Sequence, residues 1–228
     1  MRARAIALAA AVVLCGCDSA EAPDPAPEVS EAARASSEFL PYYDNPQFDP
    51  HWLGGDSAKL EHFHAIPDFV LTNQHNQTVT AQTFEGKIYI TDFFFTTCPT
   101  VCPKMMDAMG KLQETFADDE DVMFLSHSVT PEVDTPEVLE QYAERYGVVS
   151  GKWHLVTGDR SLIYSLGRDH YFVEEDLGKQ KTENDFLHTD NFLLIDKNRH
   201  IRGIYSGLSR SDMRRLVADV ATLQNEPE

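Results

Sequence analysis

Cys98 and Cys102 are the residues of this chain whose chemistry is most evident. They stand in the segment TTCPTVCPKM, with three residues between them and a proline after each. The strongly apolar segment KIYITDFFF precedes the pair, and a segment with helical periodicity follows it. We therefore expect both cysteines where a buried strand leads into a helix N-terminus. The unpaired N–H groups and partial positive charge of a helix N-terminus favour a thiolate.

The pair is compatible with several kinds of chemistry. Thioredoxin-like redox enzymes usually carry C-x-x-C, whereas the spacing here is C-x-x-x-C, which a disulfide can still bridge. Two thiolates are soft ligands that select Cu(I) or Zn(II), and an added imidazole would help to hold Cu(II). A structural zinc site would need a fourth ligand that the sequence does not identify. A buried cysteine is often only a small apolar residue, but two cysteines beside prolines at a helix start argue for chemistry. The motif alone does not decide between copper and redox.

The elements predicted to position the pair alternate between strands and helices. The order is a hairpin, then β-α-β-α-β-α, then a second hairpin and a closing helix. The expected ranges are hairpin 68–80, strand 87–95, helix 104–116, strand 121–129, a helix capped by Thr135, strand 152–156, helix 159–169, hairpin 191–205 and helix 209–223. A strand, a cysteine-bearing turn and a helix indicate an α/β thioredoxin-like fold, with a central mixed sheet flanked by helices and with added hairpins.

A distant histidine is the natural third partner for the two sulfurs. The chain has nine histidines. His188, in DFLHTDNFLLID, is expected on the loop that enters the late hairpin, and in a thioredoxin-like fold that loop lies against the helix N-terminus carrying the cysteines. His127, in FLSHSVTP, is the second candidate, because strand ends also reach that rim.

The N-terminus has the features of a bacterial lipoprotein signal peptide over residues 1–16. Two arginines precede the apolar run 5–14, which is shorter than the roughly 20 residues needed to span a bilayer. Leu14-Cys15-Gly16-Cys17 resembles a lipobox, so Cys17 is expected to be the lipidated first residue of the mature chain. The following Asp18 favours the inner membrane in some Gram-negative bacteria. We expect a membrane lipoprotein that faces the periplasm, where disulfides persist.

Composition divides the rest of the chain into three parts. Residues 17–38 are rich in Pro, Ala, Ser and Glu and are expected to form a flexible tether after the lipidated cysteine. Residues 39–61 combine aromatic residues with prolines, which predicts an irregular arm packed on the domain surface. Residues 62–228 form the predicted thioredoxin-like domain. The net charge of −18 argues against nucleic acid as a partner and against charge-driven binding to anionic lipid.

Four segments of the chain resemble the Sco (SenC) family of thioredoxin-like copper proteins, which are used in assembling cytochrome c oxidase. The segments are TDFFFTTCPTVCPKM, LSHSVTPEVDTPEVLEQYAERYGV, KWHLVTGD and DFLHTDNFLLIDKNRHIRGIYSGL, and the resemblance covers about His62 to Leu223. It implies that Cys98, Cys102 and His188 bind copper, as Cu(I) or Cu(II). It also implies delivery of copper to the binuclear site of oxidase subunit II, or reduction of the cysteines of that site.

The sequence departs from the family pattern at one strand end. An acidic residue often precedes Pro-Glu there, whereas Thr130 precedes Pro131 in this chain and Val133 follows Glu132. A role of that acid in docking or copper release is therefore in question. The expected function is that of a metallochaperone rather than an enzyme, with another copper enzyme such as nitrous oxide reductase as a different acceptor. The alternative is a thiol–disulfide oxidoreductase that uses Cys98 and Cys102 as its redox pair, without copper.

Overall fold

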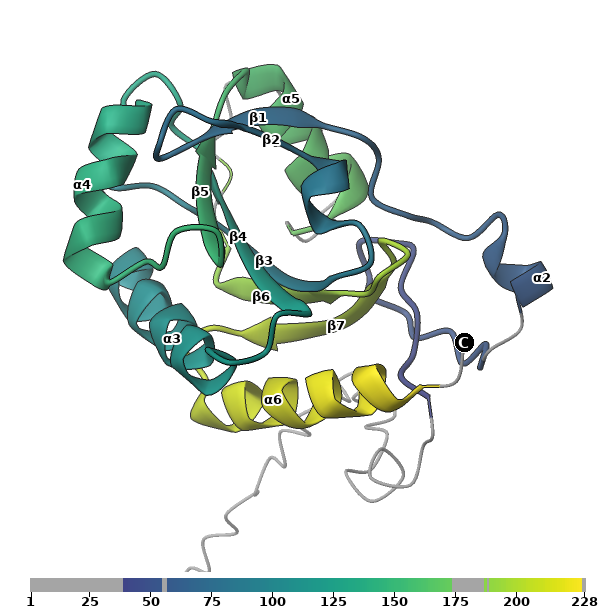
Figure 1. Ribbon diagram of the computed structural model, residues 1–228. Coiled ribbons are helices and arrows are strands. Elements are labelled where there is room, and N and C mark those ends of the chain that lie inside the picture. The colour runs from purple at the N-terminus through teal and green to yellow at the C-terminus, as the bar shows by residue number, and fades with distance from the viewer. Residues whose placement is uncertain (1–38, 55–56, 174–186, 188, 227–228) are drawn as a thin grey trace, which may run out of the picture. The chain divides into compact units, whose positions relative to one another are not determined.

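The computed structural model describes residues 39–54, 57–173, 187 and 189–226 (Figure 1). The predicted signal peptide, Cys17, the tether and His188 lie outside the described residues. All described elements belong to a compact unit, Ser37–Glu228. None of the helices in the described ranges is long and apolar enough to span a membrane.

The described residues form a seven-stranded sheet with the order β2-β1-β5-β4-β3-β6-β7. Its strands are β1 Val70–Asn73, β2 Thr78–Thr80, β3 Ile88–Phe94, β4 Val122–Ser128, β5 Trp153–Thr157, β6 Asn191–Ile195 and β7 Ile201–Ser206. Strands β3, β4 and β5 are parallel, and a hairpin adds an antiparallel pair at each side. The predicted mixed sheet with added hairpins is confirmed.

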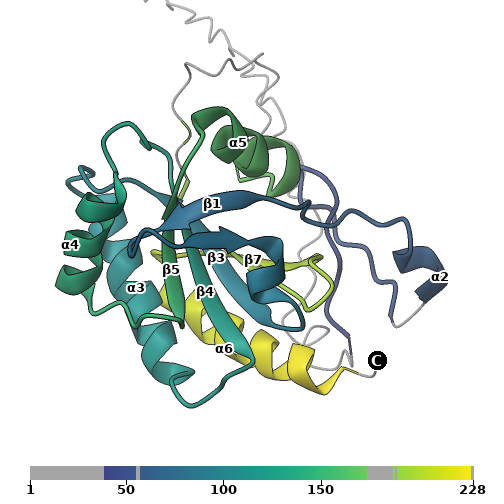
Figure 2. The same ribbon diagram turned by 45° about the horizontal axis from the view of Figure 1, so that its top comes forward.

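The helices cover both faces of the sheet. They are α2 Ser57–Leu60, α3 Val101–Thr115, α4 Pro136–Tyr146, α5 Arg160–Ser165 and α6 Arg210–Asn225, with short helical turns at Ala81–Phe84 and Leu166–His170. Helices α3, α4 and α6 lie on one side of the sheet and α5 lies on the other, as both views show (Figures 1 and 2). Helix α3 begins three residues before the predicted start, because Pro103 fits the first turn, where its missing N–H has no helical partner.

Two cores form, one on each face of the central strands. The core under α3, α4 and α6 contains Ile88, Ile90 and Phe94 of β3, and the core under α5 contains Tyr89 and Phe93. All seven residues of β3 are buried. Because both faces are covered, the strand has the near-continuous apolar sequence from which it was predicted.

The segment 39–54 packs along β7. The backbone of Tyr42 exchanges two hydrogen bonds with His51, and the Tyr43 N–H donates to the Ile201 carbonyl at 3.1 Å. Tyr42 is 5% exposed, and the guanidinium of Arg202 lies 3.8 Å from the centre of its ring. The arm is thus attached to the far strand of the sheet by backbone pairing and by one buried aromatic ring.

Candidate metal centre

The two cysteines lie at the junction between β3 and α3. The Cys98 N–H donates to the Phe95 carbonyl at 3.2 Å and forms a turn directly after the strand. Cys98 is partly exposed before the helix, whereas Cys102 is 4% exposed in its first turn. The backbone N–H of Cys102 points at the Cys98 sulfur at 3.3 Å. The structure therefore presents one sulfur to solvent at a helix N-terminus and buries the other behind it.

The pKa values of the two thiols are shifted in opposite directions. Partial burial acts to raise the pKa of Cys98, but hydrogen bonds from the backbones of Cys102, Thr100 and Val101 and from the Cys102 thiol outweigh it, so the pKa is lowered. Burial raises the pKa of Cys102 to about 12. The accessible sulfur is thus the better nucleophile and the first to be deprotonated.

A buried polar cluster lies behind Cys102. Both carboxylate oxygens of Asp92 and the hydroxyl of Tyr142 lack a hydrogen-bond partner among the described residues. Burial raises the pKa of Asp92 to about 7, and the nearby Ser126 hydroxyl opposes this only in part. The negative charge of Asp92 in turn contributes to the raised pKa of Cys102 and of Tyr142. A deprotonated Asp92 therefore works against ionisation of the buried thiol.

Asp134 fixes the loop that carries Cys98. Its carboxylate accepts from the Thr96 N–H at 3.2 Å and the Thr96 hydroxyl at 2.5 Å, and also from the hydroxyls of Ser128 at 2.6 Å and Thr130 at 2.9 Å. Sequence reasoning missed this residue. The sequence does contain a hint of it. Hydroxyl residues follow β3 and end β4, and one nearby carboxylate can accept hydrogen bonds from all of them. Thr130, where the sequence departs from the family pattern, is one of these donors.

His127 does not join the cysteines. It is fully buried, its ring stacks on Phe93 at 4.6 Å, and its Nδ1 lies 3.2 Å from the Thr91 hydroxyl. Side chains alternate along β4, and position 127 faces the core under α5, whereas Cys102 belongs to the core under α3. Burial lowers the pKa of His127 to about 4. The prediction that His127 is a second candidate ligand at the cysteine rim is therefore wrong. His127 is a neutral histidine in the core under α5.

Within the described ranges, no three His, Cys, Asp or Glu side chains form a metal-binding group. His188 lies outside those ranges, but its neighbours are placed. Leu187 is fully buried, and a Cβ added at Gly167 would come within 2.5 Å of its side chain. Strand β6 starts at Asn191 and runs antiparallel to β3, with Leu193 opposite Thr91. The chain thus enters β6 at the end of the sheet where β3 leaves toward the cysteines.

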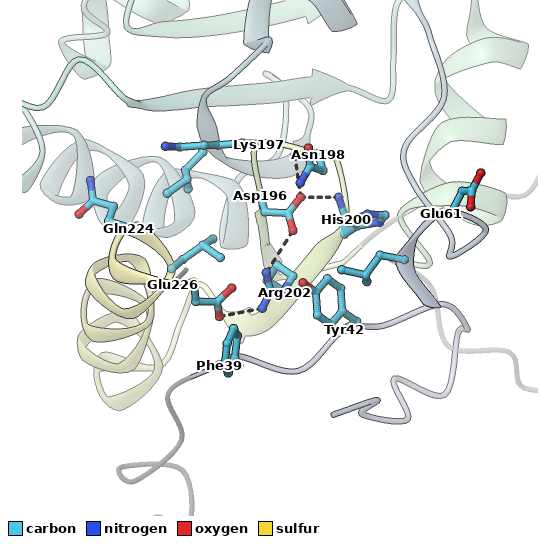
Figure 3. A pocket seen from close by; sticks show the side chains of 13 residues that line it. Phe39, Tyr42, Glu61, Asp196, Lys197, Asn198, His200, Arg202, Gln224 and Glu226 are labelled. Atoms are coloured by element: carbon cyan, nitrogen blue, oxygen red, sulfur yellow. Dashed lines mark hydrogen bonds and ion pairs between the residues drawn. The ribbon is translucent and has the colours of Figure 1, made fainter. Parts of the chain in front are cut away.

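A second charged cluster lies at the opposite end of the sheet, around Arg202 (Figure 3). It borders a cavity of about 420 Å³ between the arm, the turn after β6 and the end of α6. Arg202 donates to Asp196 at 3.1 Å, to Glu226 at 2.7 Å, and to the carbonyls of Leu40 and Pro41 at 2.8 and 3.2 Å. Both carboxylates at its centre are paired with Arg202, so this cluster ties the arm to the domain.

Comparisons with known proteins agree with this geometry. A crystal structure of a SCO1/SenC family lipoprotein from Bacillus anthracis is 31% identical, with a TM-score of 0.62 over 71% of this chain and 95% of the other. A structure of BsSco, described with a disulfide switch and as a member of the Sco family of cytochrome c oxidase assembly proteins, is 26% identical, with a TM-score of 0.59 over 70% and 93%.

A curated protein from Stutzerimonas stutzeri is 28% identical over 171 residues, which is 71% of this chain and 78% of the relative, and its name gives copper binding as a provisional assignment. The solved relatives share the thioredoxin-like arrangement of a mixed sheet flanked by helices. The SCO1/SenC family model matches residues 57–225. With well over half of its length matched, this protein belongs to the SCO1/SenC family.

Proposed function

We propose that this protein binds copper through Cys98 and Cys102 and passes it to another copper protein. The observation that carries the proposal is the asymmetry of the pair: a partly exposed Cys98 with a lowered pKa beside a buried Cys102 at one helix N-terminus. Two soft thiolates suit Cu(I). The copper-binding name of the relative and the oxidase-assembly description of BsSco support the same reading.

His188 is the proposed third ligand. Its support comes from its neighbours, since Leu187 and the start of β6 lie at the end of the sheet where β3 turns into the cysteine loop. Two thiolates are sufficient for Cu(I), whereas an imidazole improves the donor set for Cu(II). The proposed role of His188 is therefore to extend binding to the oxidised ion.

The two cysteines would act differently in transfer. Metal binding deprotonates a coordinating thiol outright, and Cys102 is the harder of the two to deprotonate because it is buried. The partly exposed Cys98 would be the ligand that an incoming thiolate or imidazole of the acceptor replaces first. Copper is cargo in this scheme, and the chain supplies two sulfurs of unequal accessibility for ligand exchange.

The proposed acceptor is the binuclear copper site of cytochrome c oxidase subunit II. We further propose that Cys17 is lipidated and holds the protein on the inner membrane, facing the periplasm. The lipobox-like residues 14–17 support the anchor, and the relative from Bacillus anthracis is described as a lipoprotein. Another extracytoplasmic copper enzyme would fit the same chemistry.

A thiol–disulfide reductase is the second candidate, and the difference in pKa between the two cysteines favours it. The Cys98 thiolate would attack an acceptor disulfide, and Cys102 would then form the Cys98–Cys102 disulfide and release the acceptor as a dithiol. The description of a disulfide switch in BsSco supports such a bond in the family. This reaction would prepare the acceptor's cysteines for copper.

A transfer experiment tests the proposal. The chain from residue 37 on, loaded with copper, is mixed with the copper-free, reduced soluble domain of an oxidase subunit II, and the absorbance of each copper site is followed. We expect copper to leave this protein and appear in the acceptor, and we expect Cys98→Ser neither to load nor to transfer. In a parallel reaction the metal-free, reduced chain is mixed with the same acceptor in its disulfide form. Rapid reduction of that disulfide, together with no copper transfer to the reduced acceptor, would contradict the metallochaperone and support the reductase.

A further inference from the structure

A groove runs between α3, the helix that carries Cys102, and α6. It has a volume of about 970 Å³ and lies between the two helices and the turn that precedes α6. Ala108 and Leu112 of α3 and Met213 and Val217 of α6 supply its apolar surface. Leu208, at the entrance to α6, is 47% exposed. The groove thus has an apolar floor with one exposed leucine at its end.

The rim of this groove is basic. The four cations Lys104 and Lys111 of α3 and Arg210 and Arg214 of α6 line it, and Asp107 is the acid among its lining residues. All four cations are exposed, and none forms an ion pair with any other residue that the structure describes. The whole chain has 37 acidic and 19 basic residues. The net positive rim of this groove contrasts with the acidic composition of the whole chain, and it favours a negatively charged partner.

We propose that this groove docks an acidic, amphipathic segment of a partner protein. An apolar floor with cations on both rims fits a helix that presents leucine-like side chains inward and carboxylates to each side. The concave shape favours such a segment over a flat bilayer. A symmetric second copy would bring the same four cations face to face, which disfavours self-association through this groove.

The groove and the cysteine pair share helix α3. Cys102 lies in the first turn of this helix, and Lys104, two residues later, lines the groove. The inference does not depend on copper, because the charge and shape of the groove are properties of the metal-free chain. If the proposed function also holds, the groove gives the acceptor its orientation.

Binding of a designed peptide tests the docking inference. The chain from residue 37 on contains the whole sheet and both cores, and it is used reduced and metal-free. The probe is a fluorescein-labelled helical peptide of about 16 residues, with leucines on one face and glutamates on both sides of it, followed by anisotropy. We expect saturable binding that weakens as salt rises from about 0.05 to about 0.5 M. The same peptide with lysine in place of glutamate should not bind.

Matched charge reversals locate the site. Lys111→Glu together with Arg214→Glu should weaken binding by about tenfold or more. The control, Arg145→Glu together with Lys197→Glu, makes the same change in net charge at exposed cations away from the groove, and it should change binding by less than about twofold. Circular dichroism confirms that both variants are folded.

Three results would overturn the inference. The first is absence of peptide binding, or binding that is equally sensitive to both double variants. The second is capture by phosphatidylglycerol vesicles without peptide binding, which would assign the groove to the membrane. The third is concentration-dependent dimerisation in sedimentation that Lys111→Glu with Arg214→Glu abolishes, which would assign it to a second copy.

Discussion

The two ends of the sheet differ in whether their buried polar groups have hydrogen-bond or ion-pair partners. Around Arg202, both buried carboxylates are paired with the guanidinium, and two backbone carbonyls take further donors. Around the cysteines, Asp92 and Tyr142 are buried with oxygens that have no partner among the described residues. At the first end the buried carboxylates are neutralised by Arg202, and the second end holds polar groups that would gain from a change of protonation or from a ligand.

This difference indicates that the Arg202 end contributes mainly to stability and the cysteine end mainly to reactivity. Leaving a buried polar group unpaired costs about 1–3 kcal/mol, so an end of the sheet that keeps such groups is less stable than it could be. Sites that bind ligands or do chemistry commonly retain such strain. We therefore expect substitutions around Arg202 to change the free energy of unfolding with little effect on the thiols, and substitutions around the cysteines to change thiol chemistry as well.

The largest expected effect is at the paired end. Arg202→Met removes the cation and leaves Asp196 and Glu226 buried without it, which should lower the free energy of unfolding in urea by about 3–5 kcal/mol. The control is Arg199→Met, which removes an ion pair whose Asp68 side chain is 73% exposed and should cost less than about 1 kcal/mol. Equal losses for the two variants would show that the Arg202 cluster is not the stabilising element described.

The next effect is a pH dependence caused by Asp92. Its pKa is about 7 in the folded state against 3.8 in the unfolded chain, so the folded state binds the proton more tightly and loses stability as pH rises between these values, by up to about 4 kcal/mol. His127 has the opposite effect: its pKa is lowered to about 4, so its contribution is lost as pH falls below about 6.5.

The variant Asp92→Asn separates these two contributions. Its stability relative to the original chain should rise between about pH 4 and pH 7 and level off above that, because His127 is common to both proteins and cancels. Urea unfolding across this range provides the measurement. A constant difference between the two proteins would mean that Asp92 is ionised throughout and has its ordinary pKa.

Asp134→Ala should have a smaller effect on stability and a direct effect on the cysteine loop. Removing the carboxylate leaves two donors of Thr96 and the hydroxyls of Ser128 and Thr130 without their acceptor, which should cost about 2–3 kcal/mol. Glu132→Ala, in the same loop but in an exposed pair with Arg160, should cost less than about 1 kcal/mol. An unchanged rate of Cys98 alkylation in Asp134→Ala would contradict its role in positioning that loop.

The smallest effect in energy is the difference between the two thiols. Cys98 in the Cys102→Ser variant should react with iodoacetamide at least about tenfold faster near neutral pH than Cys102 in the Cys98→Ser variant, because the first thiol has a lowered pKa and the second a raised one. The rate for Cys98 should also persist to lower pH. Equal rates would remove the asymmetry on which the proposed transfer depends.

The parts of this molecule that the sequence predicts are those set by local patterns. The apolar run before Cys98 predicts β3, and Pro103 predicts the start of a helix. His127 was misplaced because the rim was assigned from position along the strand, whereas the alternation of side chains decides which face a residue occupies.

The structural roles of Arg202 and Asp134 were missed for a different reason, which is that their partners lie far away in the sequence. The groups that pair with Arg202 include the carbonyl of Leu40, 162 residues away, and Asp134 binds Thr96, 38 residues away. Such pairs are created by strand order, which local periodicity does not contain. The basic groove likewise exists only because α3 and α6 pack side by side.

A copper titration tests the central claim most directly. The reduced chain from residue 37 on is titrated without oxygen with Cu(I), and separately with Cu(II) while the thiolate-to-copper absorption band is followed, in parallel with Cys98→Ser and His188→Ala. The account predicts one copper per chain, loss of both ions in Cys98→Ser, and a much greater loss of Cu(II) than of Cu(I) in His188→Ala. Unchanged binding of both ions in His188→Ala would remove His188 from the site, and absence of copper binding together with rapid disulfide exchange would contradict the account as a whole.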